Sequence, residues 1–371
     1  MNLSHRMRRE VAALERPLHG GDGWRHQGIE DFSANLNPLG PPSGLDQMLF
    51  EAASELDHYP DDSCDALKSA LAAKYGLDQG NIITGVGSSE LIRLFPEVFI
   101  ERGDKVLMPR PTFGEYSFAC RFMGAELMTE ELAPERGFRP DLDAMLQRLD
   151  GSCKAAFICN PNNPTSVCAP RKALLEFIES CERKDVLVFL DETLLELLAQ
   201  EDGISCVPEV ESHDNLLIIR SLTKSFAIPG LRVGYGLASQ RMISILERGR
   251  QTWNLGHLEQ AVSARLISER YHHVEEGKKV LEKEGPRVHA LLSQHRIKIN
   301  RPDGFYYFLD VRQAGMSGAE FRERMKGQGV LVRDCASFGP PYDGYVRFCL
   351  RTREKNELLT AALDQVLGKE G

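Results

Sequence analysis

Residues 221–235 read SLTKSFAIPGLRVGY, and the six residues before them read NLLIIR. The run NLLIIR carries no charge until Arg220, which predicts a buried strand. Pro229 and Gly230 then predict an irregular loop after that strand. The stretch therefore places Lys224 in a loop just beyond the end of a buried strand.

Lys224 stands among small hydroxyl side chains, and Arg232 follows it eight residues later. An amine in this setting can form a Schiff base with an aldehyde. Ser221 and Arg232 supply the hydroxyl and the positive charge that would hold a phosphate group. A solvated surface lysine is the alternative, because S-x-T-K alone is a weak pattern.

The overall composition is that of an ordinary globular protein. Of the 371 residues, 42% are hydrophobic and 27% are charged, and the chain is long enough for two domains. The net charge of −9 provides no basic surface for nucleic acid. No apolar run approaches the roughly 20 residues of a membrane span. The charged N-terminus also lacks the apolar core of a signal peptide.

Nine cysteines are scattered along the chain without a C-x-x-C pair. An odd, dispersed set indicates reduced thiols, so neither a disulfide framework nor a zinc site is expected. We therefore expect a cytoplasmic protein without a metal.

Apolar strand-like runs alternate with helical patterns from about residue 45 to residue 240. Helices are expected at 44–56 and 65–75, the second ending at Gly76. The alternation predicts an α/β fold with a mostly parallel central sheet and helices on both faces. In such sheets, ligands bind beyond the carboxyl ends of the strands. Five residues lie at predicted strand ends: Gly87, Phe113, Asn163, Asp191 and Lys224.

A glycine- and serine-rich turn, GVGSS at 85–89, joins a short predicted strand to an apolar helix. Backbone N–H groups at the start of a helix bind anions. Gly87 allows a close approach there, while Ser88 and Ser89 add hydroxyl donors. The turn is a candidate phosphate cradle, although many such turns only tighten a connection.

The C-terminal part of the chain predicts a second unit. Residues 240–295 are expected to be helical, with breaks near Gly256 and Gly285. The runs FYYFLDV, VLVRDC and YVRFCLR then predict strands that alternate with helices. We expect an N-terminal arm and loop (1–44) packed with the small domain, a large ligand-binding domain (45–255) and a small C-terminal α/β domain (256–371).

The motif S-L-T-K-x-x-x-I-P-G-L-R-x-G-Y and the loop NPNNPT resemble those of the class I and II aminotransferases, enzymes of pyridoxal 5′-phosphate (PLP). The matches extend over nearly the whole chain. This resemblance implies the PLP-dependent transferase fold of type I and PLP as the cofactor. It also implies that the large domain binds the cofactor.

The same resemblance assigns roles to individual residues. Lys224 would hold the cofactor, Asp191 would pair with the pyridinium nitrogen, Asn163 would bond the ring oxygen and Phe113 would stack on the ring. The expected phosphate contacts are Gly87, Ser88, Ser89, Ser221 and Arg232. Each residue also has a structural alternative: a helix cap for the aspartate, turn chemistry for the asparagine and core packing for the phenylalanine.

Tyr59, in HYPD, matches a tyrosine that reaches the cofactor phosphate of the neighbouring subunit in the family. The resemblance therefore implies a homodimer with shared active sites. It also implies that the substrate is a small phosphorylated amino acid.

Within the family, two subgroups are close: L-threonine-O-3-phosphate decarboxylases of cobalamin biosynthesis and histidinol-phosphate aminotransferases. The HGG turn, the loop DFSANLNPLGPP and VLVRDCASF resemble the decarboxylases more. That resemblance places His19, Asn35, Arg333 and Arg347 on the substrate's anionic groups. Arg351 would share a strand face with Arg347. The aminotransferase is the second hypothesis, and a non-catalytic PLP-fold binding protein is the third.

Two positions depart from the family pattern. Leu194 stands where many transaminases have a tyrosine that donates to the cofactor ring oxygen, and this is mildly against ordinary transamination. Ser166 stands where the loop after NPT usually has glycine, which questions the turn geometry there.

Overall fold

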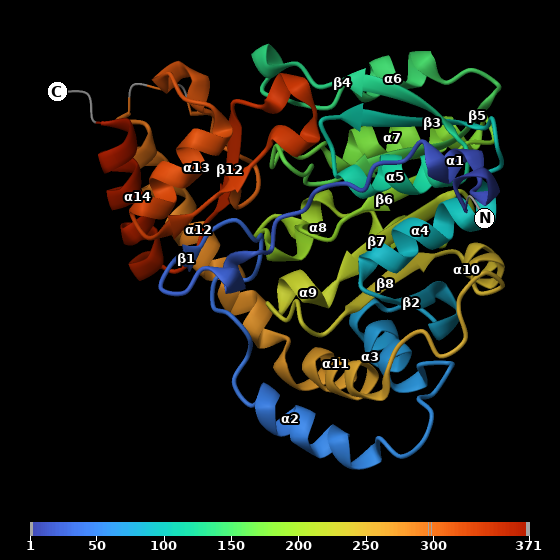
Figure 1. The fold of residues 1–371 in the computed structure, drawn as a ribbon. Helices are drawn as coiled ribbons and strands as arrows, with labels where there is room; N and C mark the ends of the chain where they lie inside the picture. Colours follow the sequence, from blue (N-terminus) through green and yellow to red (C-terminus); the bar gives the residue numbers. More distant parts are fainter. Residues whose placement is uncertain (1–2, 296, 298, 369–371) are drawn as a thin grey trace.

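The computed structural model describes residues 3–295, 297 and 299–368. Its largest feature is a seven-stranded sheet in the order β2-β8-β7-β6-β5-β3-β4 (Figure 1). β8 runs antiparallel to both of its neighbours, and the other neighbouring pairs are parallel. The predicted α/β class with a mostly parallel sheet is confirmed. The strands are β2 (Ile82–Val86), β3 (Lys105–Arg110), β4 (Glu126–Glu131), β5 (Cys153–Cys159), β6 (Leu187–Asp191), β7 (Leu216–Ser221) and β8 (Val233–Ala238).

Helices cover both faces of this sheet because successive strand side chains point to opposite sides. On β7, Leu217 and Ile219 enter one apolar cluster, while Leu216 and Ile218 enter the other. The first cluster is closed by α4 (Ser88–Phe99), α5 (Gly114–Phe122) and α10 (Gln240–Leu246). The second is closed by α3 (Asp65–Tyr75), α6 (Leu142–Arg148), α7 (Arg171–Glu182) and α11 (His257–Arg270).

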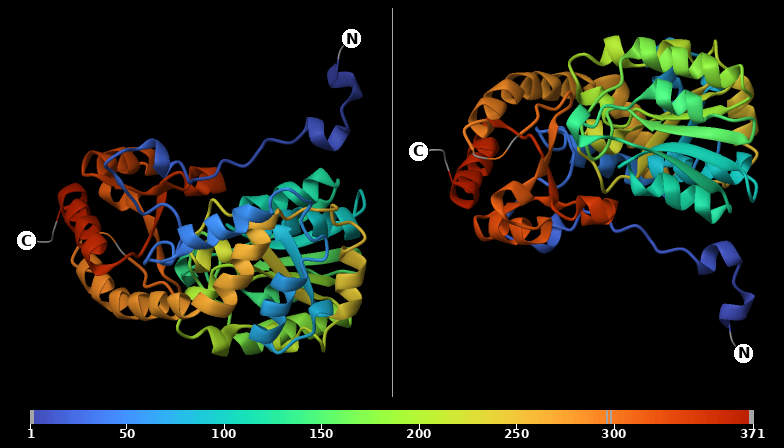
Figure 2. Two further views of the ribbon diagram at one scale, coloured as in Figure 1. Left: turned by 90° about the horizontal axis from the view of Figure 1, so that it is seen from below. Right: turned by 90° about the horizontal axis from the view of Figure 1, so that it is seen from above.

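A second, smaller unit lies beside the large sheet (Figure 2). Its three-stranded antiparallel sheet has the order β11-β12-β9, and a two-stranded parallel pair joins β1 to β10. Its elements are β1 (Glu30–Asp31), β9 (Tyr306–Asp310), β10 (Val330–Leu331), β11 (Arg333–Asp334), β12 (Tyr345–Cys349), α12 (His272–Leu292), α13 (Gly318–Gly327) and α14 (Arg353–Leu367). The shorter helices elsewhere are α1 (Arg9–Ala12), α2 (Leu45–Ala52), α8 (Glu201–Ile204) and α9 (Leu222–Ser225).

The helix breaks expected at two glycines have opposite outcomes. Gly256 does precede a helix start, since α11 begins at His257. The break near Gly285 is wrong, because α12 continues through Gly285 and Pro286 to Leu292. A proline inside a helix costs about 3 kcal/mol. Buried side chains on both sides of it, Leu281 and Val288 among them, oppose that cost by packing into the core.

The N-terminal arm connects the two units. Near its start, Arg8 donates to the carbonyl of Phe122 on α5 at 3.0 Å. Further along, Asp22 forms an ion pair with Arg322 on α13 at 3.0 Å. The arm therefore runs from the small unit across to α5, and only four of its residues form the helix α1.

All nine cysteines are free and buried. Within the described ranges, no helix has the length and apolarity to span a bilayer. The same residues contain no group of histidine, cysteine, aspartate and glutamate side chains able to hold a metal ion.

Candidate active site

The five residues predicted at strand ends do lie at one edge of the large sheet. Gly87, Phe113, Asn163, Asp191 and Lys224 follow or end β2, β3, β5, β6 and β7, which all run in the same direction. Their placement reflects the topology, because parallel strands bring distant loops together at their carboxyl ends.

The turn before α4 forms an anion cradle. Gly87 has a φ of 70°, and a Cβ there would lie 2.5 Å from Nη2 of Arg232. The same Nη2 donates to Oγ of Ser89 at 3.4 Å. Helix α4 starts at Ser88 without a side-chain cap, so its first N–H groups stay available to a ligand. Nearby, Ser221 donates to the carbonyl of Val233 at 3.2 Å, which fixes Ser221 next to Arg232.

The amine of Lys224 has an altered acidity. Burial lowers its pKa to about 8, and the guanidinium groups of Arg347 and Arg232 add to the effect. The thiol of Cys349 and the carboxylate of Asp191 act in the opposite direction. A lysine with this pKa is partly neutral near pH 7.5, as nucleophilic chemistry requires.

Asp191 is 5% exposed and is held by two donors. The Tyr116 hydroxyl donates to its Oδ2 at 2.6 Å, and the backbone N–H of Thr193 donates to its Oδ1 at 2.8 Å. Burial raises the pKa of Asp191, whereas these two hydrogen bonds lower it. Tyr116 was not predicted from the sequence. The signal available was its spacing of three residues from Phe113, which puts Phe113 at the N-cap of α5 and Tyr116 on its first turn.

Asn163 and Arg347 are in direct contact, with Nη1 of Arg347 donating to Oδ1 of Asn163. Nη2 of Arg347 donates to the carbonyl of Ser33 at 2.7 Å, and its Nε has no partner. Arg333 lies opposite Arg347 in the β11–β12 register. Among the described residues, no carboxylate lies within 4.0 Å of either guanidinium. Two cations therefore lie opposite each other across these strands, and neither has an ion-pair partner among the described residues.

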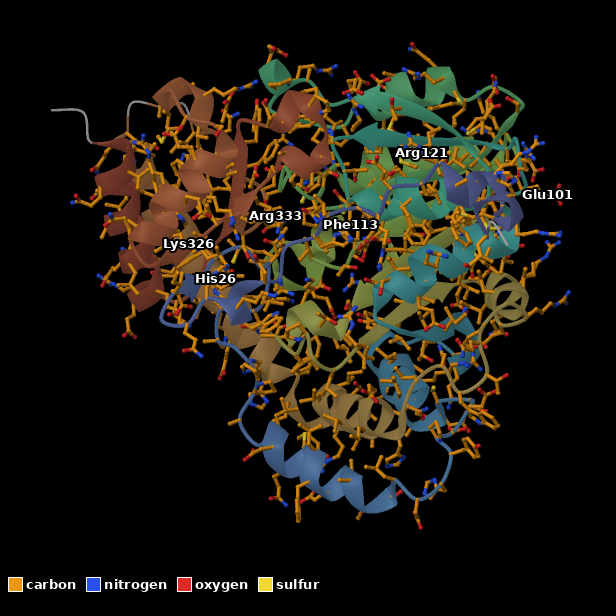
Figure 3. All side chains as sticks on the ribbon, in the orientation of Figure 1. His26, Glu101, Phe113, Arg121, Lys326 and Arg333 are labelled. Atoms are coloured by element: carbon orange, nitrogen blue, oxygen red, sulfur yellow. The ribbon has the colours of Figure 1, made fainter. Side chains whose placement is uncertain are left out.

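His19 and Asn35 approach the same region from the N-terminal side. His19 shares a hydrogen bond of 2.5 Å with Oε1 of Glu115, and its ring centroid is 5.5 Å from that of Phe113. Arg333 donates to the carbonyl of Leu18 at 2.7 Å, so the arm bridges Arg333 and Phe113, which Figure 3 labels. Asn35 is 3% exposed, and its Oδ1 has no partner.

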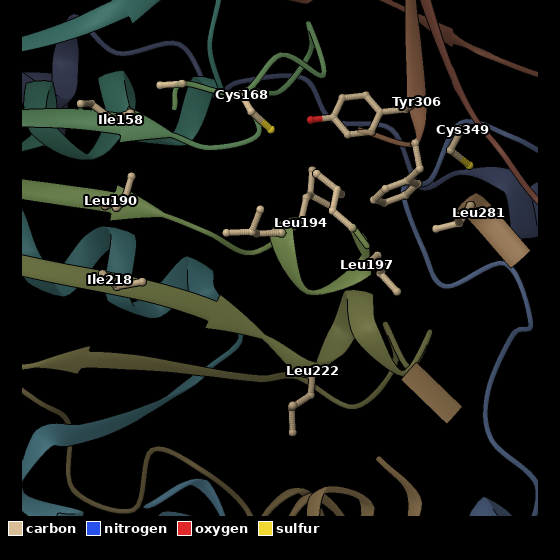
Figure 4. Close-up of a cluster of buried hydrophobic side chains, with 14 of the residues drawn as sticks. Ile158, Cys168, Leu190, Leu194, Leu197, Ile218, Leu222, Leu281, Tyr306 and Cys349 are labelled. Carbon is tan, nitrogen blue, oxygen red and sulfur yellow. The ribbon is translucent and has the colours of Figure 1, made fainter. Parts of the chain in front are cut away.

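The two departures from the family pattern have clear structures. Ser166 has a φ of 60°, the left-handed region that glycine adopts most easily. Its N–H donates to the carbonyl of Asn162 at 2.7 Å, and its carbonyl accepts from Asp303 and Gly304, so the turn is kept without glycine. Leu194 is 6% exposed and packs in the apolar cluster with Leu197 and others (Figure 4).

Two predicted residues are not brought to the site of this chain. β12 ends at Cys349, so Arg351 is not on the strand, and it donates to the carbonyl of Asp31 at 3.1 Å. The shared strand face predicted for Arg351 is therefore wrong. Tyr59 is 73% exposed and stacks on Trp253 at a centroid distance of 4.3 Å.

A buried charge network lies behind the site and was also not predicted. Arg220, which precedes Ser221, is 1% exposed. It forms ion pairs with Glu192, which follows Asp191, at 2.7 Å and with Glu201. Glu201 also pairs with Lys278 on α12 at 2.6 Å. The network joins the ends of β6 and β7 to the helix that leads into the small unit.

The donor set fits PLP. Lys224 offers a nucleophilic amine, Asp191 a buried carboxylate and Phe113 an aromatic face, while the Gly87 cradle leaves no room for a Cβ beside Arg232. Thr223, next to Lys224, has a buried hydroxyl without a partner. These unfilled donors and acceptors are those that a phosphorylated pyridine aldehyde would use.

Comparison with known proteins gives consistent matches. Residues 28–363 match the family model of aminotransferase class I and II. A Moorella thermoacetica histidinol-phosphate aminotransferase is 33% identical over 92% of this chain and 87% of its own length. A protein of Caldanaerobacter subterraneus subsp. tengcongensis, provisionally named threonine-phosphate decarboxylase, is 32% identical over 93% of this chain and 92% of its own length.

Solved structures show the same fold. Histidinol-phosphate aminotransferase from Sinorhizobium meliloti, in complex with pyridoxal 5′-phosphate, superposes with a TM-score of 0.86 at 20% identity, covering 97% of each chain. The enzyme from Clostridium acetobutylicum gives a TM-score of 0.82 at 24% identity, covering 91% of this chain and 99% of its own.

Proposed function

The chain belongs to the class I and II aminotransferase family, and from this premise we propose that it decarboxylates L-threonine O-3-phosphate to aminopropanol phosphate for cobalamin biosynthesis. The cofactor is pyridoxal 5′-phosphate. Bound PLP supplies an electron sink for the electron pair released when a bond to Cα breaks.

The residues of the chain divide the remaining tasks. Lys224 would hold the cofactor aldehyde through its amine, and Asp191 would keep the ring nitrogen protonated. Arg347 would orient the substrate carboxylate and so select the Cα bond that breaks, while Asn163 would donate to the ring oxygen of the cofactor. Lys224 would return a proton to Cα after CO₂ leaves. The bond to Cα that breaks is thus selected by the orientation of the substrate, and a small misplacement of the substrate costs orders of magnitude in rate.

The observation that carries the proposal is the pairing of Arg333 with Arg347 in register, with no carboxylate of the described residues within 4.0 Å of either guanidinium. Facing cations repel each other and lose hydration when buried, so this arrangement favours a ligand that brings two anionic groups. Phosphothreonine has a phosphate and a carboxylate, and arginine pairs bidentately with both. His19 and the unpartnered Oδ1 of Asn35 add polar contacts from the N-terminal side.

Leu194 also supports decarboxylation over transamination. In many transaminases a tyrosine at this position donates to the ring oxygen, and a leucine cannot. Its side chain contributes to the apolar cluster instead. Asn163 is left as the expected donor to that oxygen, since its Oδ1 already accepts from Arg347 and its amide N–H groups remain for a ligand.

One experiment separates the candidate reactions. The purified protein with PLP is incubated with phosphothreonine or histidinol phosphate, each with and without 2-oxoglutarate, while CO₂ and glutamate are measured. Aminopropanol phosphate and CO₂ formed without 2-oxoglutarate support the decarboxylase. Glutamate formed from histidinol phosphate, with no CO₂ from phosphothreonine, overturns it.

Histidinol-phosphate transamination is the second candidate, favoured by the 33% identity to the Moorella thermoacetica enzyme. Histidinol phosphate has no carboxylate to lose. An aminotransferase must, however, bind a dicarboxylate acceptor, which the two arginines would also suit. The incubations with and without 2-oxoglutarate distinguish arginines that bind a dicarboxylate acceptor from arginines that bind phosphothreonine.

We further propose a cytoplasmic homodimer with shared active sites, which accords with nine buried free thiols and an exposed Tyr59. We also propose the domain division 1–44, 45–255 and 256–371, in which α11 of the last unit packs against the large sheet. The pairing of β1 with β10 supports grouping the N-terminal segment with the small unit.

A further inference from the structure

Asn37 lies beneath the turn that carries Lys224. It is fully buried, and each of its polar groups has a partner. Its backbone N–H donates to the carbonyl of Lys224 itself at 3.0 Å. Its side-chain amide donates to the carbonyls of Ser225 at 2.8 Å and His273 at 3.3 Å, and its Oδ1 accepts from the N–H of Leu39 at 3.1 Å.

We propose that Asn37 is a positioning residue, which fixes the Lys224 turn against helix α12 so that the amine meets the cofactor aldehyde in one orientation. The proposal rests on Lys224 as the residue that captures PLP and is independent of which reaction follows.

The first support is that Asn37 joins three separate segments. Two of its contacts reach consecutive residues of the turn, Lys224 and Ser225, and a third reaches His273 on α12. The turn α9 is four residues long, and its own backbone hydrogen bonds come from the residues that follow it, with Phe226 N–H donating to the carbonyl of Leu222 at 3.0 Å. The donors of Asn37 to the carbonyls of Lys224 and Ser225 add an anchor from outside the turn.

The second support is the close approach of α12. A Cβ on Gly277 would lie 2.4 Å from Oδ1 of Asn37 and 2.6 Å from its Nδ2. The helix can approach Asn37 this closely only because residue 277 has no side chain. The close approach of α12 thus restricts the space in which the Asn37 side chain can move.

The third support is that the segment before Asn37 is tied to the strand of Arg347. The carbonyl of Phe32 accepts from the N–H of Cys349 at 2.9 Å, and that of Ser33 accepts from Arg347 at 2.7 Å. Asn35, expected on the substrate, stands between these ties and Asn37. Residues 32–37 thus connect the arginine that would orient the substrate to the lysine that captures the cofactor.

The acidity of Lys224 reports the position of its amine, because several groups face it. Arg347 and Arg232 disfavour the charged amine, Asp191 and the thiol of Cys349 favour it, and burial disfavours it most. A turn that loosens lets water reach the amine and moves it relative to these groups.

The test uses the apo-protein, to which PLP is added, followed by borohydride reduction and mass spectrometry of the adduct. First, wild type must carry the adduct on Lys224; an adduct elsewhere refutes the proposed function and not only this inference. The rate of PLP capture is then measured against pH for wild type, Asn37→Ala and Asn37→Asp. The aspartate keeps the acceptor for Leu39 but cannot donate to Ser225 or His273.

For both Asn37 variants we expect capture on the order of tenfold slower, with its pH midpoint raised by about half a unit or more. Asn81→Ala is the matched control. Asn81 is also fully buried, and it donates to the carbonyl of Ala238 at 2.9 Å, away from the lysine turn. We expect it to lower thermal stability without moving the midpoint.

Gly277→Ala is a second variant for the same test if Asn37→Ala does not fold. Its added Cβ displaces Asn37 but leaves the Asn37 side chain chemically intact. A shifted midpoint in Gly277→Ala supports the proposal. An unchanged rate and midpoint in the folded variants overturns it, as does an equal shift in Asn81→Ala.

Discussion

At the residue scale, the burial of Lys224 sets the pH at which its amine becomes free. Its pKa is lowered to about 8 from an ordinary value of 10.5. Only the neutral amine attacks an aldehyde, so PLP capture should rise with pH around a midpoint of about 8 and level off roughly one pH unit higher. An exposed lysine would continue to gain rate beyond pH 10.

Replacing Arg347 tests the cause of this shift. Arg347→Gln removes a cation that disfavours the charged amine, so the midpoint of capture should move upward from about 8. The measurement is the pH profile of borohydride-trapped adduct. A midpoint that stays constant would show that Arg347 has no influence on the amine, while Lys224→Ala should give no adduct at that position.

Tyr116 and Asp191 form the second residue-scale prediction. Asp191→Asn should keep PLP bound but reduce turnover by orders of magnitude, since each pKa unit of charge stabilisation is worth about 1.4 kcal/mol. Tyr116→Phe removes one hydrogen bond to the carboxylate and should cost on the order of tenfold in kcat.

The pH dependence of kcat distinguishes a hydrogen-bonding role of Tyr116 from a packing role. The hydrogen bond from Tyr116 lowers the pKa of Asp191, so its loss raises that pKa. In Tyr116→Phe, activity should therefore fall at a higher pH during acidification than in wild type. Identical acid limbs in kcat profiles would assign Tyr116 to packing alone.

At the element scale, the β11–β12 pair holds Arg333 and Arg347 opposite each other. Arg333→Ala and Arg347→Ala should each weaken substrate binding by roughly 2–5 kcal/mol, by analogy with the truncation of buried charge pairs at interfaces. PLP binding should change far less, because the proposed site of its phosphate is the Gly87 cradle. Titrations of substrate and of PLP check this, and equal losses of both ligands would make the arginines structural.

Local sequence patterns predicted much of the fold because apolar runs and helix-ending glycines determine the structure of only a few neighbouring residues. The run NLLIIR became the core of β7, and Gly76 ends α3 with a φ of 67°, as expected. Local punctuation failed at Gly285, where packing of α12 outweighs a glycine followed by a proline. It also failed at Arg351, because β12 stops at Cys349. The strand β4 was not predicted.

Local sequence patterns predicted only part of the candidate site as well. Strand ends gave Gly87, Asn163 and Asp191 directly, since topology gathers them at one edge. The contact of Tyr116 with Asp191 and the ion pair of Arg220 with Glu192 depend on which elements become neighbours. The sheet order, with β8 between β2 and β7, is set by long-range packing that no local pattern contains.

At the scale of the whole molecule, the exposed Tyr59 bears on assembly. If Tyr59 serves the partner's cofactor, mixing Tyr59→Phe with Lys224→Ala chains gives hybrid dimers. One site then carries both changes and the other carries neither. Activity should recover on mixing, up to the share of hybrids. A stable and fully active monomer in sedimentation would contradict shared sites.

The stack of Tyr59 on Trp253 has an optical consequence. The chain has only two tryptophans, and the other, Trp24, is 77% exposed. Trp24→Phe therefore leaves one fluorophore, 48% exposed in the single chain and in contact with the tyrosine expected to cross to the partner. Its emission should shift to shorter wavelength as subunits associate and water leaves the indole. Dilution of the Trp24→Phe protein in a fluorimeter would then follow dissociation without any added dye.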